Sequence, residues 1–575
     1  MVATIPAGRW SDRRTVGVVT GAVAAPILVL LARVVRSHWL SIADWAAIEL
    51  RTRDVGTAHI PLVGPASRYG WNHPGPMLFY VLALPYRLFG REAHGLLAGA
   101  LAVNAAALAL IAVVLWRRGG VAGLTIGFAA VLLLTRALGA GFLVDPWNPY
   151  VIVLPLVAVI CLSWAAADGD LWALPAAIGV GSFAVQSHVG VALAVLAPIA
   201  VAVLVLLLDA RRCGFRRLRP AALSSVVVAV ICWSAPLVQQ FQPGGGNLGD
   251  LMRFWARAHP RTTGWSKGAR LIGQQLAIPA PWFTGHQHVN VYSGGVEPPW
   301  KVPITLFLLV GAMAVAALRR DRQSFTLDSL ALAFAFAALF SAAHIVDTPY
   351  NYIVRWMWTV GAIAWLAIIW TAWRAFPRSI VRDRAASWSA AAVGTVLAGM
   401  LAVGAVHARV PVQADQGTLA GIAPIARRAL RALPGPVLLE GAHGDFHSTE
   451  SAVGVLLVGI DAGIDARLAG SAANAVGTAH TTSKVRARSV VVVAVDNLIG
   501  PYRNDPAFRT IARYDPLTVE ERTYRSAVLA ELQRAASGGF AGLKRWSATH
   551  QRDRSRVHEL DGRGPRIELF LQTAR

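Results

Sequence analysis

Long apolar runs separated by short polar segments dominate the first 406 positions of the chain. Runs of about 17–21 residues recur there, and a helix of that length crosses the roughly 30 Å of hydrocarbon in a bilayer. The pattern predicts eleven spans. A further apolar piece, Pro76–Phe89, is short and contains Pro85 and Arg87, so we predict a helix that lies along the outer interface.

The predicted spans cover about residues 15–34, 96–116, 121–141, 150–166, 171–185, 189–208, 221–240, 303–318, 327–343, 353–373 and 387–406. Arg9, Arg13 and Arg14 precede the first span, which predicts a cytoplasmic N terminus by the positive-inside rule. With eleven spans, the Arg clusters at 117–118, 211–219, 319–322 and 374–384 all fall on the cytoplasmic face, and the acidic and aromatic loops fall outside. The first outer loop then covers 35–95 with interfacial helices, and a long outer loop covers 241–301.

Residues 407–575 have the pattern of a soluble domain, which this topology places outside the membrane. PVLLEGA (436–442) and RSVVVVAVD (488–496) are short apolar runs rich in β-branched residues and predict buried strands. Thr518–Ala536 opens with a helix-capping signal and predicts an amphipathic helix, and RIELFLQ (566–572) alternates like a strand with one wet face. The fold class is therefore a polytopic α-helical membrane domain over 1–406, followed by an extracytoplasmic α/β domain over 407–575.

Composition agrees with this class: 55% of the residues are hydrophobic and only 15% are charged. The net charge of +23 does not indicate nucleic acid, because much of the excess lies in the short clusters that the positive-inside rule produces. The three cysteines lie in or beside spans without metal-ligand or disulfide spacing.

The polar segment Asp44–Gly75 carries the most chemistry, since it follows the first span directly. Asp44 and Glu49 lie there with Trp71 and His73, at the predicted edge of a bilayer. Acids and a histidine in that position suit a reaction on a lipid-linked substrate, because acid–base catalysis needs such groups beside the acceptor.

Several motifs then follow in order: the early outer-loop Asp44, His73-Pro74, the amphipathic FYVLALPYRLFG (79–90), a span that ends in Arg117-Arg118, and an outer loop containing VDP (144–146). Over about residues 15–170 this order resembles the first module of GT-C glycosyltransferases, specifically the protein-mannosyltransferase and aminoarabinose-transferase branch. The resemblance implies about eleven transmembrane helices of GT-C type and a polyprenyl-phosphate sugar as donor.

By that resemblance Asp44 takes the place of the presumed catalytic base, Asp145 that of the acid in the second outer loop, and His73 that of the residue before the interfacial helix. The family often has Asp-Glu where this chain has Asp44-Trp45, so Glu49 is the candidate for the second carboxylate. A divalent cation, Mg²⁺ or Mn²⁺, is the one cofactor to consider, and Asp44 and Asp145 are its candidate ligands.

Transfer from a phosphate-linked sugar also needs donors on the departing phosphate. Besides His73, the candidates are cationic or titratable residues near outer span ends: Arg68, Arg136, His188 and Arg355. Asn148 is a candidate ligand of the donor, and Trp71 is a candidate to stack on the sugar.

Each candidate has a structural alternative. Asp44 can cap a helix, Glu49 can form an ordinary pair with Arg53, and Asp145 can belong to an Asp-Pro turn. His188 can be a turn histidine, and Arg355 and Trp71 can belong to the aromatic and cationic belt at the interface.

The sequence thus predicts an enzyme of EC class 2.4 that moves an arabinose- or mannose-class sugar from a polyprenyl-phosphate donor to a cell-envelope glycan, lipid or protein. The enzyme is expected to contact membrane lipid and not to bind nucleic acid. The rival classes are a transporter or lipid-linked-sugar flippase, and a non-catalytic scaffold with the same fold. Transporters favour inverted repeats, and no repeat is evident here.

Overall fold

The computed structural model describes residues 24–257, 261–286, 299–376, 396, 399–400, 402–408, 410–537 and 539–573. The chain divides into two compact units. The bundle unit comprises Met1–Ser37 and Leu62–Pro411, and the sheet unit comprises His38–Pro61 and Val412–Arg575. The segment 38–61, part of the predicted first outer loop, therefore belongs with the C-terminal residues.

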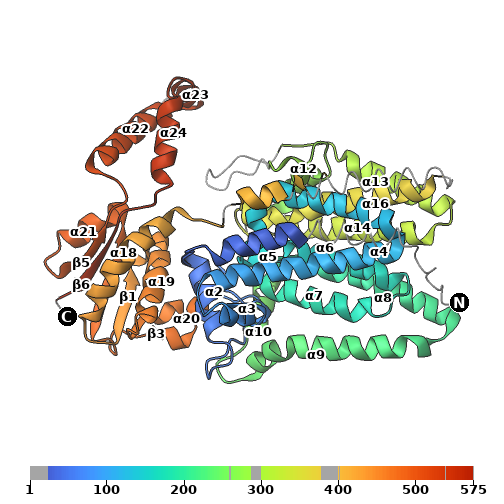
Figure 1. Cartoon of the computed structure of the whole chain (residues 1–575), viewed down its shortest axis with the longest axis horizontal. Coiled ribbons are helices and arrows are strands. Elements are labelled where there is room, and N and C mark those ends of the chain that lie inside the picture. The colour runs from blue at the N-terminus through green and yellow to red at the C-terminus, as the bar shows by residue number, and fades with distance from the viewer. Residues whose placement is uncertain are drawn as a thin grey trace. The chain divides into compact units, whose positions relative to one another are not determined.

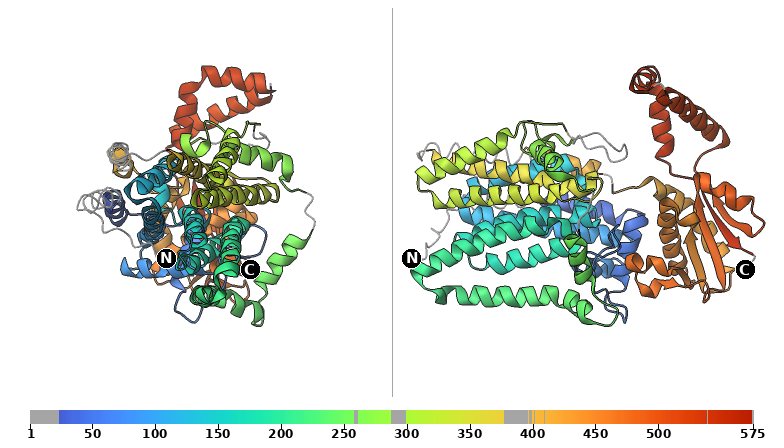
Figure 2. Two further views of the ribbon diagram at one scale, coloured as in Figure 1. Left: turned by 90° about the vertical axis from the view of Figure 1, so that its right-hand side faces the viewer. Right: turned by 180° about the vertical axis from the view of Figure 1, so that it is seen from behind.

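The bundle unit consists of long helices packed side by side (Figures 1 and 2). Its helices are α3 (Met77–Leu88), α4 (His94–Leu138), α5 (Asn148–Val151), α6 (Val153–Ala167), α7 (Ala173–Ser187), α8 (Ala192–Cys213), α9 (Arg219–Phe241), α10 (Asn247–Ala256), α11 (Gly264–Gln275), α12 (Pro281–Thr284), α13 (Ile304–Leu318), α14 (Arg322–Ala343), α15 (Asn351–Val354) and α16 (Trp358–Ala375).

Six helices among the described residues are long and apolar enough to cross a membrane: His94–Gly120, Asn148–Ala167, Val189–Arg212, Phe215–Phe241, Arg322–Ala343 and Asn351–Ala375. Four more predicted spans coincide with shorter apolar helices, Ala24–Val35, Ala122–Leu138, Ala173–Ser187 and Ile304–Leu318. The predicted span at 387–406 lies largely outside the described residues. The predicted helix at Pro76–Phe89 is present as α3.

Burial ranks these helices from the centre of the bundle to its edge. Every residue of α6 is buried. In α9 only Ala221, Ser225 and Pro236 are buried, and side chains such as Leu223 and Ile231 are exposed. Long exposed runs of Leu, Val and Ile on a helix are the expected surface toward lipid.

Small residues allow α4 to approach α16 closely. Gly120 bends α4 with a positive φ of 58°. A Cβ on Gly119 would lie 2.7 Å from the ring of Trp370, and one on Gly123 would lie 3.0 Å from it. Glycine is needed where the backbone packs directly on an aromatic ring, as at many helix contacts in membranes.

Ion pairs join the connections at one end of the bundle. Arg118 pairs with Asp168 and with Asp170, Arg322 pairs with Asp209, and Arg374 pairs with Asp321 at 2.6 Å. These pairs bring the predicted cytoplasmic Arg clusters to a common end. The prediction that acidic loops all lie at the other end was wrong, because several of these arginines are neutralised by local aspartates.

The predicted long loop at 241–301 is partly helical, since it contains α10, α11 and α12. Asn247 at the start of α10 exchanges two hydrogen bonds with the backbone of Asn72, at 2.9 and 3.0 Å. Residues far apart in the sequence therefore meet at this end of the bundle.

The sheet unit has a six-stranded sheet in the order β3-β2-β1-β4-β6-β5. Its strands are β1 (Val437–Gly441), β2 (Ala466–Ala469), β3 (Thr481–Thr482), β4 (Ser489–Val495), β5 (Phe508–Tyr514) and β6 (Ile567–Gln572), and its helices are α2 (Ala43–Arg53), α18 (Ala414–Arg431), α19 (Phe446–Asp461), α20 (Ala473–Val476), α21 (Ile499–Arg503), α22 (Val519–Ser537), α23 (Gly539–Thr549) and α24 (Gln551–Asp561). β1 to β4 are parallel, and β6 is antiparallel to both β4 and β5.

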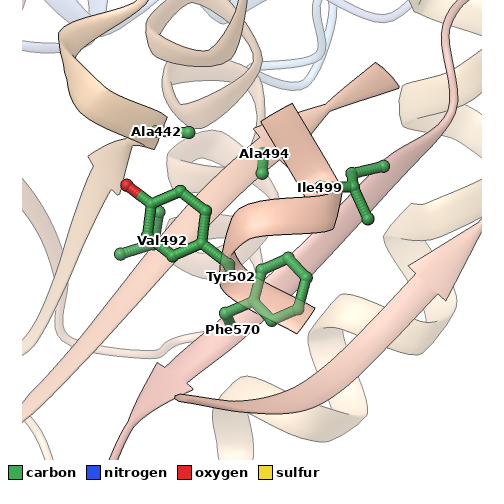
Figure 3. Packing of buried hydrophobic residues seen from close by; sticks show 6 residues of the cluster. All are labelled: Ala442, Val492, Ala494, Ile499, Tyr502 and Phe570. Atoms are coloured by element: carbon green, nitrogen blue, oxygen red, sulfur yellow. The ribbon is translucent and has the colours of Figure 1, made fainter. Parts of the chain in front are cut away.

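The predicted strands at 436–442 and 488–496 are confirmed as β1 and β4, and all seven residues of β4 are buried. α18 and α19 pack on the sheet, and α2 packs on α19. Figure 3 shows the cluster under α21, in which Tyr502 lies against Phe570 of β6 and Val492 of β4. Burial of the whole of β4 explains why this central strand is apolar after Ser489.

Two other predictions for this unit have different outcomes. The capping signal at Thr518 is confirmed, because Thr518 and Glu521 exchange the paired hydrogen bonds of a capping box at the start of α22. The predicted wet face of β6 was wrong: Glu568 is 1% exposed and is paired with Arg503 and Arg566. A charged residue in an alternating strand normally predicts a solvent-exposed position. Here the carboxylate is buried because two guanidinium groups pair with it.

The contact of α18 with β5 gives a test of this packing. A Cβ on Gly421 would lie 2.1 Å from the ring of Tyr514. We expect Gly421→Ala to destabilise the sheet unit by about 1–3 kcal/mol, because the ring must move, and to lower the thermal unfolding temperature of the purified protein. Gly500→Ala is the matched control, since a Cβ there meets no atom within 4 Å. Equal unfolding temperatures for the two variants would contradict the packing.

Candidate functional site

The bundle unit gathers most of the predicted site residues at one end, around a short hairpin at 64–73. His73 N–H donates to the carbonyl of Pro65 at 2.8 Å, and Gly64 N–H donates to the carbonyl of His73 at 2.9 Å. A Cβ on Gly64 would lie 2.7 Å from the carbonyl oxygen of Gln186. The hairpin is therefore packed directly on the turn that follows α7.

His73 and His188 form a buried imidazole pair between this hairpin and that turn. Their ring centroids are 5.0 Å apart. The backbone N–H of Val189 donates to His73 Nδ1 at 3.2 Å, so the proton of a neutral His73 is on Nε2. His188 Nδ1 is buried and has no hydrogen-bond partner within the protein.

Burial lowers the pKa of both imidazoles. The pKa of His188 falls to about 4, and that of His73 falls well below its usual value, with the charge of His188 as a second cause. Both rings are therefore neutral at neutral pH. Each can donate or accept a hydrogen bond without adding charge to the site.

Trp71 is also buried in the hairpin and belongs to an aromatic group. It stacks on Tyr69 with a centroid distance of 5.9 Å, lies edge-on to Phe254 at 5.5 Å and meets His73 at 5.6 Å. Its indole Nε1 is buried without a partner within the protein. One donor thus remains for a ligand hydroxyl, while the ring itself is largely covered.

Asp145 and Asn148 lie in the next loop, and both are buried. Asp145 accepts a hydrogen bond from the backbone N–H of Trp147 at 2.9 Å, which is the geometry of an Asx turn. The Asn148 amide donates to the carbonyl of Ser187 at 3.1 Å, which fixes this loop to the turn of His188. Asp145 therefore has the predicted turn role.

Arg355 lies just before α16. Its guanidinium lies over the ring of Trp358 at 4.3 Å and hydrogen-bonds the phenol of Tyr150. Tyr150 in turn packs against Trp147 at 5.0 Å, so Arg355 is tied to the loop of Asp145 and Asn148. Among the described residues no carboxylate pairs with Arg355, so its charge remains for an anion.

Arg68 and Arg136 have other contacts. Arg68 donates to the carbonyl of Val346 at 2.9 Å and lies over the ring of Tyr350 at 5.0 Å, which ties the hairpin to the loop before α15. Arg136 is exposed, and its guanidinium lies 3.5 Å from the carbonyl of Phe283. The structure thus groups His73, His188, Asn148 and Arg355 by shared contacts, and it gives Arg68 a role in joining two loops.

Asp44 and Glu49 belong to the sheet unit, on α2. Glu49 is buried and accepts hydrogen bonds from Ser41 and, at 2.5 Å, from Arg53. The predicted i,i+4 pair with Arg53 is therefore present, and it occupies Glu49. Arg53 also pairs with Asp461 of α19 at 2.7 Å, which fixes α2 to α19.

Asp44 is exposed near the N terminus of α2 and interacts electrostatically with Glu450 of α19. Burial raises the pKa of Glu450 to about 8, and the negative charges of three aspartates add to the shift. These are Asp44, Asp415 and Asp445. Glu450 is therefore protonated at neutral pH, and Asp44 has a neutral carboxylic acid as its neighbour.

Within the described residues, no group of three or more His, Cys, Asp or Glu side chains is placed to hold a metal ion. The candidate ligands Asp44 and Asp145 lie in different units. We therefore assign no step to a metal.

Three contributors were not predicted. Gln186 is fully buried, its amide donates to the carbonyl of Cys232 at 2.7 Å, and its Oε1 has no partner within the protein. Tyr150 and Glu450 were also missed. A polar residue in the middle of an apolar pattern is a signal that could have identified Gln186, whereas Glu450 lies in an ordinary helical sequence.

Comparison with known proteins agrees with this architecture. The structure is similar to a crystal structure of ArnT from Cupriavidus metallidurans in the apo state, with a TM-score of 0.53 and 15% sequence identity, over 87% of this chain and 96% of that chain. It is similar to the same protein bound to undecaprenyl phosphate, with a TM-score of 0.51 and 15% identity, over 86% and 96% of the two chains. No protein-family model and no curated protein matches the sequence.

The chain therefore shares the fold of this ArnT structure. With its long apolar helices, it is a multi-pass α-helical membrane protein.

The buried imidazole pair predicts a pH dependence of stability. The unfolded chain binds protons on these rings near pH 6.5, as ordinary histidines do, whereas folded His188 does so only at a pKa of about 4. Stability is therefore full above about pH 6.5 and falls as the pH falls toward about 4. In His73→Gln one such ring is lost, while the amide oxygen can still accept from Val189.

We expect the unfolding temperature of His73→Gln to fall less than that of the wild type between pH 7 and pH 5. His59→Gln is the control, because His59 is exposed and should leave the wild-type slope unchanged. Parallel pH profiles for the wild type and His73→Gln would contradict the burial of a neutral His73.

Proposed function

We propose that the chain is a membrane glycosyltransferase that moves a sugar from a polyprenyl-phosphate donor to a cell-envelope acceptor on the outer face of the membrane. The observation that carries this proposal is the fold shared with ArnT, which has been solved with undecaprenyl phosphate bound. An arabinose- or mannose-class sugar is the proposed cargo. The proposed topology has eleven spans, a cytoplasmic N terminus and an extracytoplasmic C-terminal α/β domain.

The proposed reaction has one base and one departing anion. Asp44 takes the proton from the acceptor hydroxyl, the acceptor oxygen forms a bond to the anomeric carbon, and the bond from that carbon to the phosphate oxygen breaks. The polyprenyl phosphate leaves with the electron pair of that bond. A single displacement of this kind inverts the anomeric carbon.

The contacts of the bundle unit support the roles given to the phosphate ligands. Arg355 supplies the positive charge, since its contacts with Trp358 and Tyr150 do not neutralise it. His73 supplies a neutral donor, because Val189 occupies its Nδ1 and leaves the proton on Nε2. A fixed charge and a fixed dipole stabilise a developing anion without reorganising.

The environment of Asp44 supports its role as base. Its neighbour Glu450 is protonated and uncharged at neutral pH. Asp44 can therefore be ionised without repulsion from a negative charge on Glu450. The same neutral Glu450 can donate a hydrogen bond toward an acceptor hydroxyl. Asp145 would organise the acceptor side through its turn, as a positioning residue.

The first test is transfer by the purified protein in lipid nanodiscs, with radiolabelled polyprenyl-phosphate arabinose and mannose as donors and envelope extract as acceptor. We expect Asp44→Asn to reduce transfer by about 10²–10⁴-fold, the usual contribution of a general base. Asp250→Asn is the matched control, because Asp250 is an exposed aspartate that pairs with Arg253.

Transfer that survives in a folded Asp44→Asn protein would move the base to another carboxylate, first to Asp145. Absence of transfer by the wild type with either donor would contradict the proposed donor class and favour a non-catalytic scaffold.

A second test concerns Arg355. We expect Arg355→Ala to raise the KM for the donor about tenfold or more, the loss that follows removal of one charge-assisted hydrogen bond. Arg355→Lys should recover part of it, because a point charge replaces the planar fork. Arg253→Ala, at an exposed pair, is the control. A variant whose KM is unchanged while kcat falls would show that Arg355 does not bind the donor in its ground state.

A further inference from the structure

A polar pocket in the bundle unit is lined by none of the residues to which the proposed function gives the donor phosphate. It is a cavity of about 220 Å³ beside the end of α11 and the short α12, lined by Gln274, Pro279, Pro281, Thr284, His286 and Lys301. One water molecule needs only about 10–15 Å³ of such volume. The pocket can therefore hold a group much larger than a water molecule.

Gln274 is the feature that marks this pocket as a binding site. Its side chain is 1% exposed, and neither Nε2 nor Oε1 has a hydrogen-bond partner among the described residues. The large majority of buried side-chain polar atoms are hydrogen-bonded, since an unmade bond costs about 1–3 kcal/mol. An amide with both ends unpaired in the wall of a cavity fits a polar ligand that occupies the cavity.

The charges around the pocket indicate the chemistry of that ligand. Lys301 lines it directly, and Arg270 lies close by over the ring of Trp300 at 5.2 Å. The described residues of 264–286 and 299–305 contain Lys267, Arg270, His286 and Lys301, and they contain no Asp or Glu. This part of the surface is cationic, so an anion is favoured over a neutral sugar or an amine.

The rest of the lining narrows the choice further. Pro279 and Pro281 have no N–H group, so this part of the wall offers no backbone donors that compete with Gln274 and Lys301. His286 Nδ1 donates to the carbonyl of Thr284 at 3.0 Å, which holds the 284–286 turn beside the cavity. An ammonium group and an amide N–H on one cavity match the acceptor oxygens of a phosphate.

We propose that this pocket binds a phosphate group, with Lys301 as its counter-charge and the Gln274 amide as its buried donor. This site goes beyond the proposed function, which assigns the donor phosphate to Arg355 and His73. A second phosphate site would bind a molecule other than the sugar donor. That molecule is either a lipid with a phosphate headgroup or free phosphate.

The test measures binding to the full-length protein in nanodiscs of neutral phosphatidylcholine, with two probes: inorganic phosphate and a short-chain phosphatidic acid. We expect Lys301→Ala and Gln274→Glu each to weaken binding about tenfold or more. Gln274→Glu keeps the shape and places a negative charge in the pocket. Lys267→Ala removes a charge from α11 without touching the lining, so it should bind as the wild type does. Arg355→Ala measures the share of binding that belongs to the proposed donor site.

Tight binding of phosphatidic acid alone would support a lipid headgroup, and equal binding of inorganic phosphate would support a free anion. Either result supports the site if the Lys301 and Gln274 variants bind that probe more weakly than the wild type does. Binding that is unaffected by both variants, or a wild type that binds neither probe, would overturn the inference. Sugar transfer is measured separately, so the donor assignment and this site can fail independently.

Discussion

The constraint on which the bundle unit depends is that backbone N–H and C=O groups cannot remain unpaired inside hydrocarbon. Its apolar segments satisfy this requirement as helices, and its irregular segments are collected at the helix ends. There they must pair with one another. The bonds between His73 and Val189, between Asn72 and Asn247, and between Asn148 and Ser187 satisfy groups that a helix would otherwise have satisfied. The candidate site is built from these pairings.

This origin explains the character of the site. Its histidines are neutral because they are packed between elements rather than exposed to water. Its aromatic residues pack on one another, as Trp71 does with Tyr69 and Phe254, and so they stiffen the loops. Charge comes from Arg355, which Trp358 and Tyr150 hold in place. Such a site offers fixed dipoles and one positive charge, which suits an anion that forms during a reaction.

The sheet unit solves a different problem. Its parallel strands are covered on both faces, and α2 from the N-terminal part of the chain adds a further helix beside α19. As a result, Asp44 meets Glu450, which is more than 400 positions later in the chain. The neighbouring carboxyl groups cannot all be charged in a partly buried place, so one of them keeps its proton.

The sequence by itself determined the helical segments and the central strands, because apolar period and length are local properties. The apolar runs gave ten described helices, and the β-branched runs gave β1 and β4. It also singled out His73, His188, Asn148 and Arg355 as candidates, because ionisable and polar residues at the ends of spans are functional candidates.

Only the tertiary structure decided which of these residues meet. In the structure, Glu49 pairs with Arg53, Asp145 caps a turn, and Arg68 contacts a neighbouring loop. Glu568 is buried, although the alternating pattern of its strand predicted a solvent-exposed position. The structure also leaves the amide of Gln274 unpaired at a cavity. Pairing and burial depend on residues that are distant in the sequence, and a local pattern contains no information about them.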